Sequence, residues 1–280
     1  MPCKNPVCVV VTGASSGLGR AVTELALQEG CNVVATLRTP SMLDDLTAQY
    51  EPSRLLVLPL DVSVKDDVTA AFARARVAFG CIDVVYSNAG YTIVGEVEDA
   101  PDALTRPLFD TNFWGAVYVA QEALRFFRDV NQSPGGRLLQ VSSFLGYASI
   151  PSAAFYSLEA LTEGMVQELS EGWNIKTTII QPGLYPTKIL SSKMAVHPLS
   201  AKYCASDNQS RAVRDGLASA TATRKSVAKY AAQVFRLAQL DEPPLRLALG
   251  DDALAAMRGK VEQLVKEMDD YAIWSADLDL

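Results

Sequence analysis

The sequence predicts an α/β fold in which helices flank a doubly wound parallel sheet. A short apolar run at residues 7–11 leads into a glycine-rich turn at 12–19, and a helical pattern follows. Strand and helix patterns alternate from there to residue 86, which is typical of βαβ units with right-handed crossovers. Hydrophobic residues make up 49% of the 280 residues, which is enough for one large core. No linker or repeat divides the chain, so we expect a single domain over residues 1–280.

The remaining elements follow from local patterns. Gly30 ends the first helix at about residue 29. Strands are expected at residues 32–38, 54–60, 81–86, 137–141, 176–181 and 245–250. Helices are expected at residues 41–50, 65–79, 108–129, 226–240 and 251–271, with an acidic loop at 95–107. Residues 184–225 are a long segment at the carboxyl edge of the sheet, which we interpret as a substrate lid rather than a disordered insertion.

Composition argues against several functional classes. The net charge of −7 disfavours a surface for nucleic acid or anionic membranes. No apolar run approaches the roughly 18–20 residues of a membrane span, and residues 1–6 contain no apolar signal core. The five cysteines are scattered and His197 is the only histidine, so we expect a cytoplasmic protein without a metal site.

The glycine-rich turn is the first candidate site. Gly13, Gly17 and Gly19 allow the backbone to turn sharply and to approach a ligand closely. The helix that follows presents free N–H groups and the positive end of its dipole to a phosphate. The same pattern also occurs in ordinary strand-to-helix turns, so a dinucleotide site is inferred only together with later landmarks.

The end of the second strand predicts which dinucleotide binds. NAD-binding sites place an acidic residue here to hold the ribose 2′-hydroxyl. This chain has Thr36 and Leu37 followed by Arg38, which suits a 2′-phosphate, so NADP(H) is favoured over NAD(H). The alternative is that Arg38 is a solvated surface side chain. Asp61 and Asn88 follow two further strands, at the edge where parallel sheets bind ligands.

Several motifs together resemble those of the short-chain dehydrogenase/reductases, over roughly residues 5–190. In chain order they are Thr12-Gly13-x-x-x-Gly17-x-Gly19, Asp61, Ser87-Asn88-Ala89-Gly90, Asn112, Ser143, Tyr156 and Pro182-Gly183. The longer C-terminal region is similar to the 17β-hydroxysteroid-dehydrogenase-like branch common among fungal reductases. The resemblance implies a Rossmann-type fold and an NADP(H)-dependent oxidoreductase.

The resemblance also implies roles for the matching residues. Tyr156 would transfer a proton, Ser143 would hydrogen-bond the substrate oxygen and Asn112 would hold a relay water, because hydride transfer to a carbonyl carbon needs a proton at the oxygen. Asn112 is alternatively a structural bracket between apolar neighbours. The residues expected along the cofactor are Gly13, Ser15, Gly17, Leu18, Arg38, Asp61, Val62, Asn88, Ala89, Gly90, Pro182, Gly183 and Thr187.

One position departs from this family. Its Tyr-x-x-x-Lys motif places a lysine one helical turn after the tyrosine, but that position is Ala160, and no lysine occurs before Lys176. Residues 158–163 resemble family sequence that normally follows the lysine, so about one helical turn, or four to five residues, is missing. Tyrosine titrates near 10. Without a cation Tyr156 should stay protonated, which suits carbonyl reduction better than alcohol oxidation.

Three explanations of the missing lysine are open. In a reductase, Lys188 or Lys193 replaces it. Alternatively, the chain binds NADP(H) without hydride transfer, as a pseudoenzyme or a non-redox isomerase or cyclase. In the third explanation an incorrect exon junction removed the turn. The leading hypothesis is the reductase, acting on a hydrophobic ketone or aldehyde of secondary-metabolite type, or oxidising the alcohol.

The candidate pocket residues are mostly apolar, which is the basis for expecting a hydrophobic substrate. They are Tyr91, Phe144, Leu145, Tyr147, Leu184, Tyr185 and Met194. For each of them the alternative is simple core packing. The resemblance further implies a homodimer or homotetramer that pairs the helix at 108–129 with the helix after Tyr156, and the missing turn alters that surface.

Overall fold

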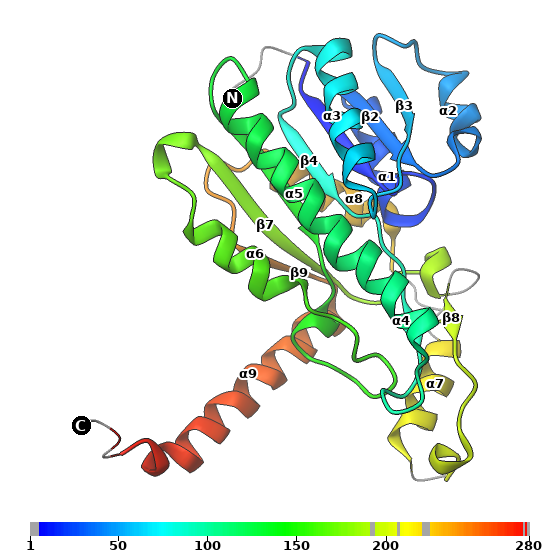
Figure 1. The fold of residues 1–280 in the computed structure, drawn as a ribbon, viewed down its shortest axis with the longest axis vertical. Helices are drawn as coiled ribbons and strands as arrows, with labels where there is room; N and C mark the ends of the chain where they lie inside the picture. The colour runs from blue at the N-terminus through cyan, green and yellow to red at the C-terminus, as the bar shows by residue number, and fades with distance from the viewer. Residues whose placement is uncertain (1–5, 191–193, 206–207, 220–224, 277, 279–280) are drawn as a thin grey trace.

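A seven-stranded, fully parallel sheet forms the centre of the molecule (Figure 1). The computed structural model describes residues 6–190, 194–205, 208–219, 225–276 and 278. The strand order is β3-β2-β1-β4-β6-β7-β9, so the chain winds outward in both directions from β1, and the predicted doubly wound sheet is confirmed. The strands are β1 Cys8–Thr12, β2 Asn32–Leu37, β3 Leu55–Pro59, β4 Val84–Ser87, β6 Gly136–Val141, β7 Ile175–Pro182 and β9 Arg246–Leu249.

The alternating side chains of β1 enter two separate cores, one on each face of the sheet. Val9 and Val11 pack in a cluster with residues of α1 (Gly17–Gln28) and α8 (Val227–Ala238). Cys8 and Val10 pack on the other face with α3 (Lys65–Phe79) and α5 (Ala116–Arg125). Period-two alternation of a strand explains this division. The sheet is therefore buried on both faces, as parallel sheets generally are.

Two predicted elements differ in the structure. The helix expected at 108–129 begins earlier, because α4 spans Asp102–Phe109 and continues through a π-helical stretch, Asp110–Gly115, into α5. The expected acidic loop therefore ends at residue 101, where Pro101 and then Asp102 are helix-start residues. The helix expected at 41–50 is a 3₁₀ turn, Pro40–Leu43, followed by the short α2, Asp44–Thr47.

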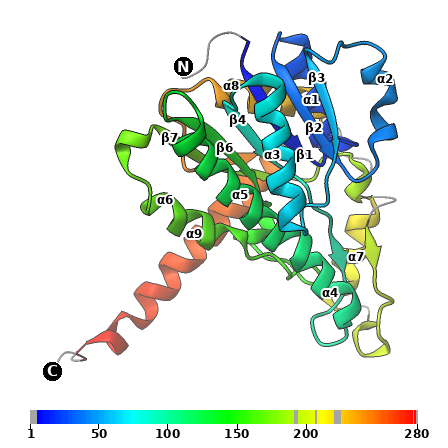
Figure 2. The same cartoon turned by 45° about the horizontal axis from the view of Figure 1, so that its top comes forward.

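The segment interpreted as a lid lies beyond the carboxyl edge of the sheet (Figure 1). It contains β8 (Ala195–Val196) and α7 (Gln209–Ser219), and β8 pairs in parallel with β5 (Ile93–Val94) in a separate two-stranded sheet. The other helices are α6 (Leu158–Gln167) and α9 (Asp251–Tyr271), and α9 projects from the body of the molecule (Figure 2). Within the described residues, no helix combines the length and the apolar character needed to cross a membrane.

Candidate active site

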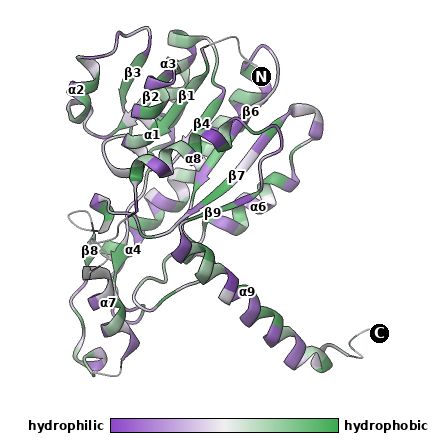
Figure 3. Ribbon diagram, turned by 180° about the vertical axis from the view of Figure 1, so that it is seen from behind, coloured by the Kyte–Doolittle hydropathy of each residue, from purple (hydrophilic) through white to green (hydrophobic). Residues whose placement is uncertain are grey.

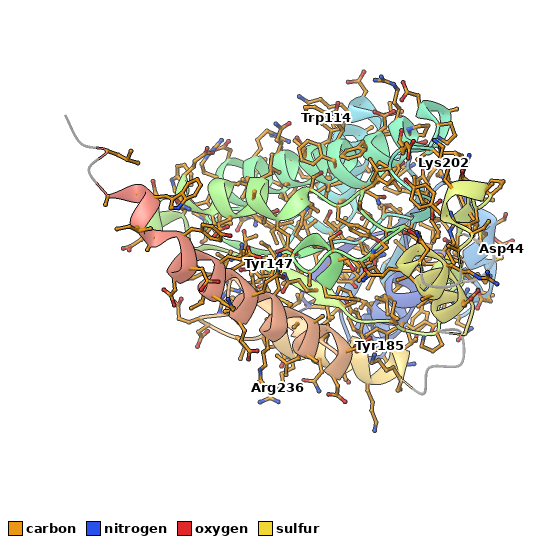
Figure 4. The ribbon with its side chains drawn as sticks, turned by 90° about the horizontal axis from the view of Figure 1, so that it is seen from below. Asp44, Trp114, Tyr147, Tyr185, Lys202 and Arg236 are labelled. Carbon is orange, nitrogen blue, oxygen red and sulfur yellow. The ribbon has the colours of Figure 1, made fainter. Side chains whose placement is uncertain are left out.

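One cavity of about 300 Å³ lies at the carboxyl ends of the sheet strands and gathers nearly all the predicted site residues. Its lining includes the predicted catalytic residues Asn112, Ser143 and Tyr156 and all thirteen predicted cofactor residues. Of the predicted substrate residues, Phe144, Leu145, Leu184, Tyr185 and Met194 line it, and so does Tyr91. Tyr147 does not line the cavity. It directly follows the 3₁₀ turn Phe144–Gly146 and is labelled in Figure 4.

The glycine-rich turn is shaped by close backbone approach. Gly13 and Gly17 have φ values of +70° and +60°, which favour glycine. A Cβ on Gly19 would lie 2.4 Å from the Gly13 carbonyl oxygen and 2.5 Å from the Asn88 amide nitrogen. The turn therefore requires these glycines, and its backbone N–H groups lie at the start of α1, where a diphosphate can be seated.

Thr12 belongs to the glycine motif, but its role was not predicted from the sequence. Its hydroxyl accepts hydrogen bonds from the backbone N–H groups of Asn88 (2.9 Å) and Ala89 (3.0 Å). The Asn88 side-chain amide also donates to the Thr12 carbonyl oxygen at 2.9 Å. Because Thr12 is fully buried, these bonds fix the end of β4 beside the glycine turn.

Arg38 lies at the end of β2 and lines the cavity with its side chain exposed. No acidic side chain among the cavity-lining residues occupies the end of that strand, and Asp61 follows β3. One Asp61 carboxylate oxygen accepts hydrogen bonds from the Ser63 N–H (3.0 Å) and hydroxyl (2.7 Å). Asp61 is thus held in its turn, and Arg38 is the charged group at this end of the cavity that can meet a phosphate.

Asn112 lies in the π-helical stretch between α4 and α5. Its carbonyl oxygen accepts from the Tyr91 N–H at 3.1 Å, and its amide donates to the Tyr91 carbonyl oxygen at 2.7 Å. The side chain therefore brackets the backbone after β4, which is one of its two expected roles. π-Helical turns within α-helices occur often at functional sites.

Tyr156 and Ser143 both line the cavity, but Tyr156 does not belong to a helix. It precedes Ser157, the residue that caps α6. Its hydroxyl lies 3.1 Å from the Thr92 hydroxyl, and either can donate. Burial raises the pKa of Tyr156 above its ordinary value of 10.0, and the Thr92 hydrogen bond opposes this only in part. The phenol is therefore protonated at neutral pH.

The missing helical turn leaves no lysine beside Tyr156 in the chain. Ala160, at the position of the family lysine, is an exposed residue on α6. Among the residues that line the cavity, the cationic side chains are Arg38 and Lys188. Lys193, the other predicted substitute, lies outside the described residues.

Glu159 does not line the cavity, but it supports the residues beside it, a role that the sequence did not reveal. Its carboxylate is buried in the first turn of α6 and accepts two 2.8 Å hydrogen bonds from the Gln181 amide. It also accepts from the Ser142 hydroxyl at 3.1 Å and lies 3.5 Å from the Arg246 guanidinium. These bonds connect the remaining start of α6 to the ends of β6 and β7, next to Ser143.

Asp252, in the first turn of α9, was also not predicted. It accepts from the Leu184 N–H at 2.8 Å and pairs with Lys225, and a Cβ on Gly183 would lie 1.9 Å from its carboxylate. Burial raises the pKa of Asp252, but Lys225 and the backbone N–H bonds outweigh burial and hold that pKa below its usual value. The charged carboxylate fixes the turn after β7.

Ion pairs connect the described part of the segment at 184–225, interpreted above as a lid, to the body. Arg214 of α7 donates to both oxygens of the buried Glu96 carboxylate, at 2.9 and 2.7 Å, and to the His197 carbonyl oxygen. Ser152, in the loop before Tyr156, donates to Glu96 at 2.7 Å. Lys202, at the outer edge of the molecule in Figure 4, pairs with Glu98. Glu96 therefore anchors both α7 and the loop that carries Tyr156.

Comparison with known proteins identifies the family. Residues 7–197 match the sequence family described as short chain dehydrogenase. This protein is a short-chain dehydrogenase/reductase. An uncharacterized oxidoreductase of Schizosaccharomyces pombe is 35% identical to it over 93% of this chain and 88% of the relative. The oxidoreductase calM of Penicillium decumbens is 32% identical over 95% of this chain and 91% of the relative.

Solved structures agree with this assignment. A short-chain dehydrogenase from Streptomyces avermitilis superposes with a TM-score of 0.89 and 29% identity, covering 99% of this chain and 100% of that one. More distant members, at 21% identity, share the fold. One from Burkholderia phymatum was solved with NAD at a TM-score of 0.79, covering 93% of this chain and 95% of that one. The short-chain dehydrogenase is thus an oxidoreductase by family, and nucleotide cofactors of the NAD(P) type bind to proteins of its fold.

Proposed function

We propose that this short-chain dehydrogenase is an NADP(H)-dependent reductase of ketones or aldehydes on hydrophobic small molecules of secondary-metabolite type. The observation that carries the proposal is the protonated Tyr156 phenol in the cavity that the glycine turn also lines. A carbonyl oxygen that gains electron density as hydride arrives needs a proton donor within hydrogen-bond reach. A neutral phenol provides one, whereas alcohol oxidation would need a base.

The residues present fit an NADP(H) cofactor. A Cβ on Gly13 or Gly19 would clash with the Gly13 carbonyl or with Asn88 and Ala89, so these glycines let the turn pack tightly against the end of β4. The N–H groups at the start of α1, on a wall of the cavity, are of the kind that holds a diphosphate. NADPH, when bound, supplies the hydride. Around it Arg38 would hold the 2′-phosphate, and Asn88 and Thr187 would orient the ribose and nicotinamide ends. Tighter binding of NADPH than of NADH is the check on the Arg38 assignment.

Ser143 and Tyr156 would act on the carbonyl oxygen of the substrate. Ser143 accepts a 3.2 Å hydrogen bond from the Leu145 N–H, which orients its hydroxyl so that its own proton is available to a substrate oxygen. Tyr156 donates its phenolic proton to that oxygen. Phe144, Leu145 and Leu184 supply apolar walls beside them, which supports a hydrophobic substrate.

The missing lysine favours a second candidate function, in which the protein binds NADP(H) without hydride transfer. The absence of a lysine one turn after Tyr156 removes the group that in this family would bind the nicotinamide ribose and lower the tyrosine pKa. A pocket that keeps the nucleotide cradle but lacks that cation suits a pseudoenzyme or a non-redox isomerase or cyclase. Consumption of NADPH distinguishes this candidate from the reductase.

The test is Tyr156→Phe, with Tyr147→Phe as the matched control because Tyr147 does not line the cavity. We expect Tyr156→Phe to reduce NADPH oxidation with a panel of hydrophobic ketones by about 10²–10⁴-fold, with unchanged quenching of NADPH fluorescence. The control should retain full turnover. Equal turnover in Tyr156→Phe would remove Tyr156 from the chemistry. Quenching without oxidation by the unaltered protein would favour the second candidate.

A further inference from the structure

Helix α9 is anchored to the body only by its first turns and then projects into solvent (Figures 1 and 2). Ala253 is fully buried in a cluster with Phe144 and Leu145, and Met257 packs against the same cluster. Beyond these turns most of the large apolar side chains are exposed, and Leu264 is half-buried. Val261 is 46% exposed, Met268 63% and Trp274 77%. An amphipathic helix with such a surface normally covers it with a partner.

The apolar side chains of α9 form one continuous seam with alternating spacings of three and four residues, the pattern of a coiled coil. The seam residues are Leu254, Val261, Leu264, Met268 and Tyr271, in line with Met257, whose side chain packs against the body. Figure 3 shows apolar and polar residues alternating along the length of this helix. The period of the seam favours a second helix of comparable length as the partner.

The charges beside the seam favour a second copy of α9 as the partner and an antiparallel direction for the pair. Lys260 lies next to the seam in the first half of the helix, and Glu267 occupies the equivalent position one heptad later. In an antiparallel pair that aligns Val261 with the partner's Leu264, Lys260 faces the partner's Glu267 twice, once on each side of the twofold axis. A parallel pair in register would place the basic parts of the two helices together, and likewise the acidic parts.

A membrane is the other surface that Tyr271, Ile273 and Trp274 could enter. The acidic side chains Glu262, Glu267, Asp269 and Asp270 surround this part of the helix, and anionic lipids repel them. The net charge of −7 acts in the same direction. Self-association therefore fits the charges of α9 better than a lipid surface does.

We propose that two copies of this short-chain dehydrogenase dimerise by antiparallel pairing of their α9 helices. The seam residues interdigitate, and Lys260 pairs with the partner's Glu267. Because the first turns of α9 pack against Phe144 and Leu145 of the cavity wall, the tip of each helix comes to lie beside the base of the partner's helix, next to its substrate pocket. In this dimer the tip of each α9 helix lies next to the substrate pocket of the other copy.

The oligomeric state of the full chain tests this pairing. We expect a dimer in sedimentation equilibrium, and Val261→Asp should raise its dissociation constant by at least about tenfold, since the dyad buries the new charge twice. The control is Val77→Asp on α3, because Val77 is 89% exposed away from the seam. Both variants should keep the thermal unfolding midpoint of the monomer. A monomer at all concentrations, or a dimer that Val261→Asp leaves unchanged, would overturn the proposal.

Charge exchange tests the antiparallel direction. Lys260→Glu alone and Glu267→Lys alone each create two like-charge contacts and should each weaken the dimer by about tenfold or more. An equimolar mixture of the two variants restores both opposite-charge contacts, and a heterodimer should form at nearly the original affinity. Failure of the mixture to associate contradicts the antiparallel pair.

Spin labels provide a separate geometric readout. Labels at Ser275 should lie roughly 37 Å apart along the antiparallel axis, whereas a parallel pair would place them about 10 Å apart. A short distance would overturn the assigned direction. Flotation of the protein with phosphatidylserine vesicles, lost in Met268→Asp, would instead assign the seam to a membrane and overturn the proposal.

Discussion

The two halves of the cavity contrast in what holds them in place. The half that β1, β2 and β4 build depends on backbone geometry, because Gly19 has no room for a side chain and Thr12 ties β4 to the turn. The half around Tyr156 depends on contacts between side chains that are distant in sequence. The Tyr156 hydroxyl contacts the Thr92 hydroxyl, and Glu159 accepts hydrogen bonds from Gln181. It also has Ala160 where the family motif has a lysine.

A site built from tightly packed backbone and a site built from side chains should differ in how well they tolerate substitutions. A diphosphate site fails when one atom intrudes, because packed interiors do not yield by an ångström without cost. Tyr156 lines the cavity although it lies outside a helix, because its hydroxyl contacts the Thr92 hydroxyl and α6 begins just after it at Leu158. We therefore expect substitutions to impair the half of the cavity built by the glycine turn more than the half around Tyr156.

The largest effect is expected from Gly19→Ala. The new methyl group would lie 2.4 Å from the Gly13 carbonyl oxygen, so the turn must shift and the NADPH dissociation constant should rise by at least about a hundredfold. The measurement is titration of NADPH fluorescence. Gly164→Ala in α6 is the control, since no atom lies within 4 Å of that position, and it should stabilise the fold by about 0.5–1 kcal/mol. Unchanged NADPH affinity in Gly19→Ala would show that the glycine turn tolerates substitution after all.

Glu159→Gln should reduce the free energy of unfolding by about 2 kcal/mol, because it places an amide against the Gln181 amide and leaves the buried side of Arg246 without a charge partner. Glu163→Gln is the matched control. Glu163 pairs with the same Arg246 at 2.8 Å but is 42% exposed, so its loss should cost about 0–1 kcal/mol. Urea denaturation measures both, and equal costs would show that burial of Glu159 is irrelevant.

Restoring the missing turn should change the direction of catalysis. Inserting Ala-Ser-Lys-Ala-Ala after Ser157 places a lysine four residues after Tyr156, and a nearby cation lowers a tyrosine pKa. We expect kcat/KM for alcohol oxidation at neutral pH to rise by about tenfold or more. The same insertion with methionine in place of lysine separates charge from length. If both insertions behave alike, the lysine charge is not the missing factor.

The smallest effect concerns pH. Burial raises the pKa of Tyr156 above 10.0, so the acid form persists through neutral and mildly alkaline solution. The rate of ketone reduction at saturating NADPH should therefore change less than about twofold up to roughly pH 9 and decline only above the ordinary tyrosine value. A decline centred near neutral pH would show that another cation, such as Lys188, lowers that pKa after all.

Part of the site could be predicted from the sequence because its signals are local. The glycine turn, the charge at the end of β2 and the polar residues after β4 each follow a buried strand within a few residues, so their meeting at one edge of a parallel sheet is a consequence of topology. The absence of a lysine four residues after Tyr156 could likewise be read from the local sequence, where Ala160 stands. Helices such as 65–79 and 251–271 were predicted at their observed bounds because their apolar periodicity is continuous.

Which distant residues meet depends on long-range packing, which local sequence patterns do not show. Asp252 reaches the Leu184 N–H across 68 positions. Glu159 contacts Ser142 just after β6, Gln181 of β7 and Arg246 of β9. Tyr147 is adjacent in sequence to the cavity wall, yet it does not line the cavity. Local patterns fix which backbone a segment forms, whereas long-range packing fixes which side chains share a space, and no spacing along the chain encodes that packing.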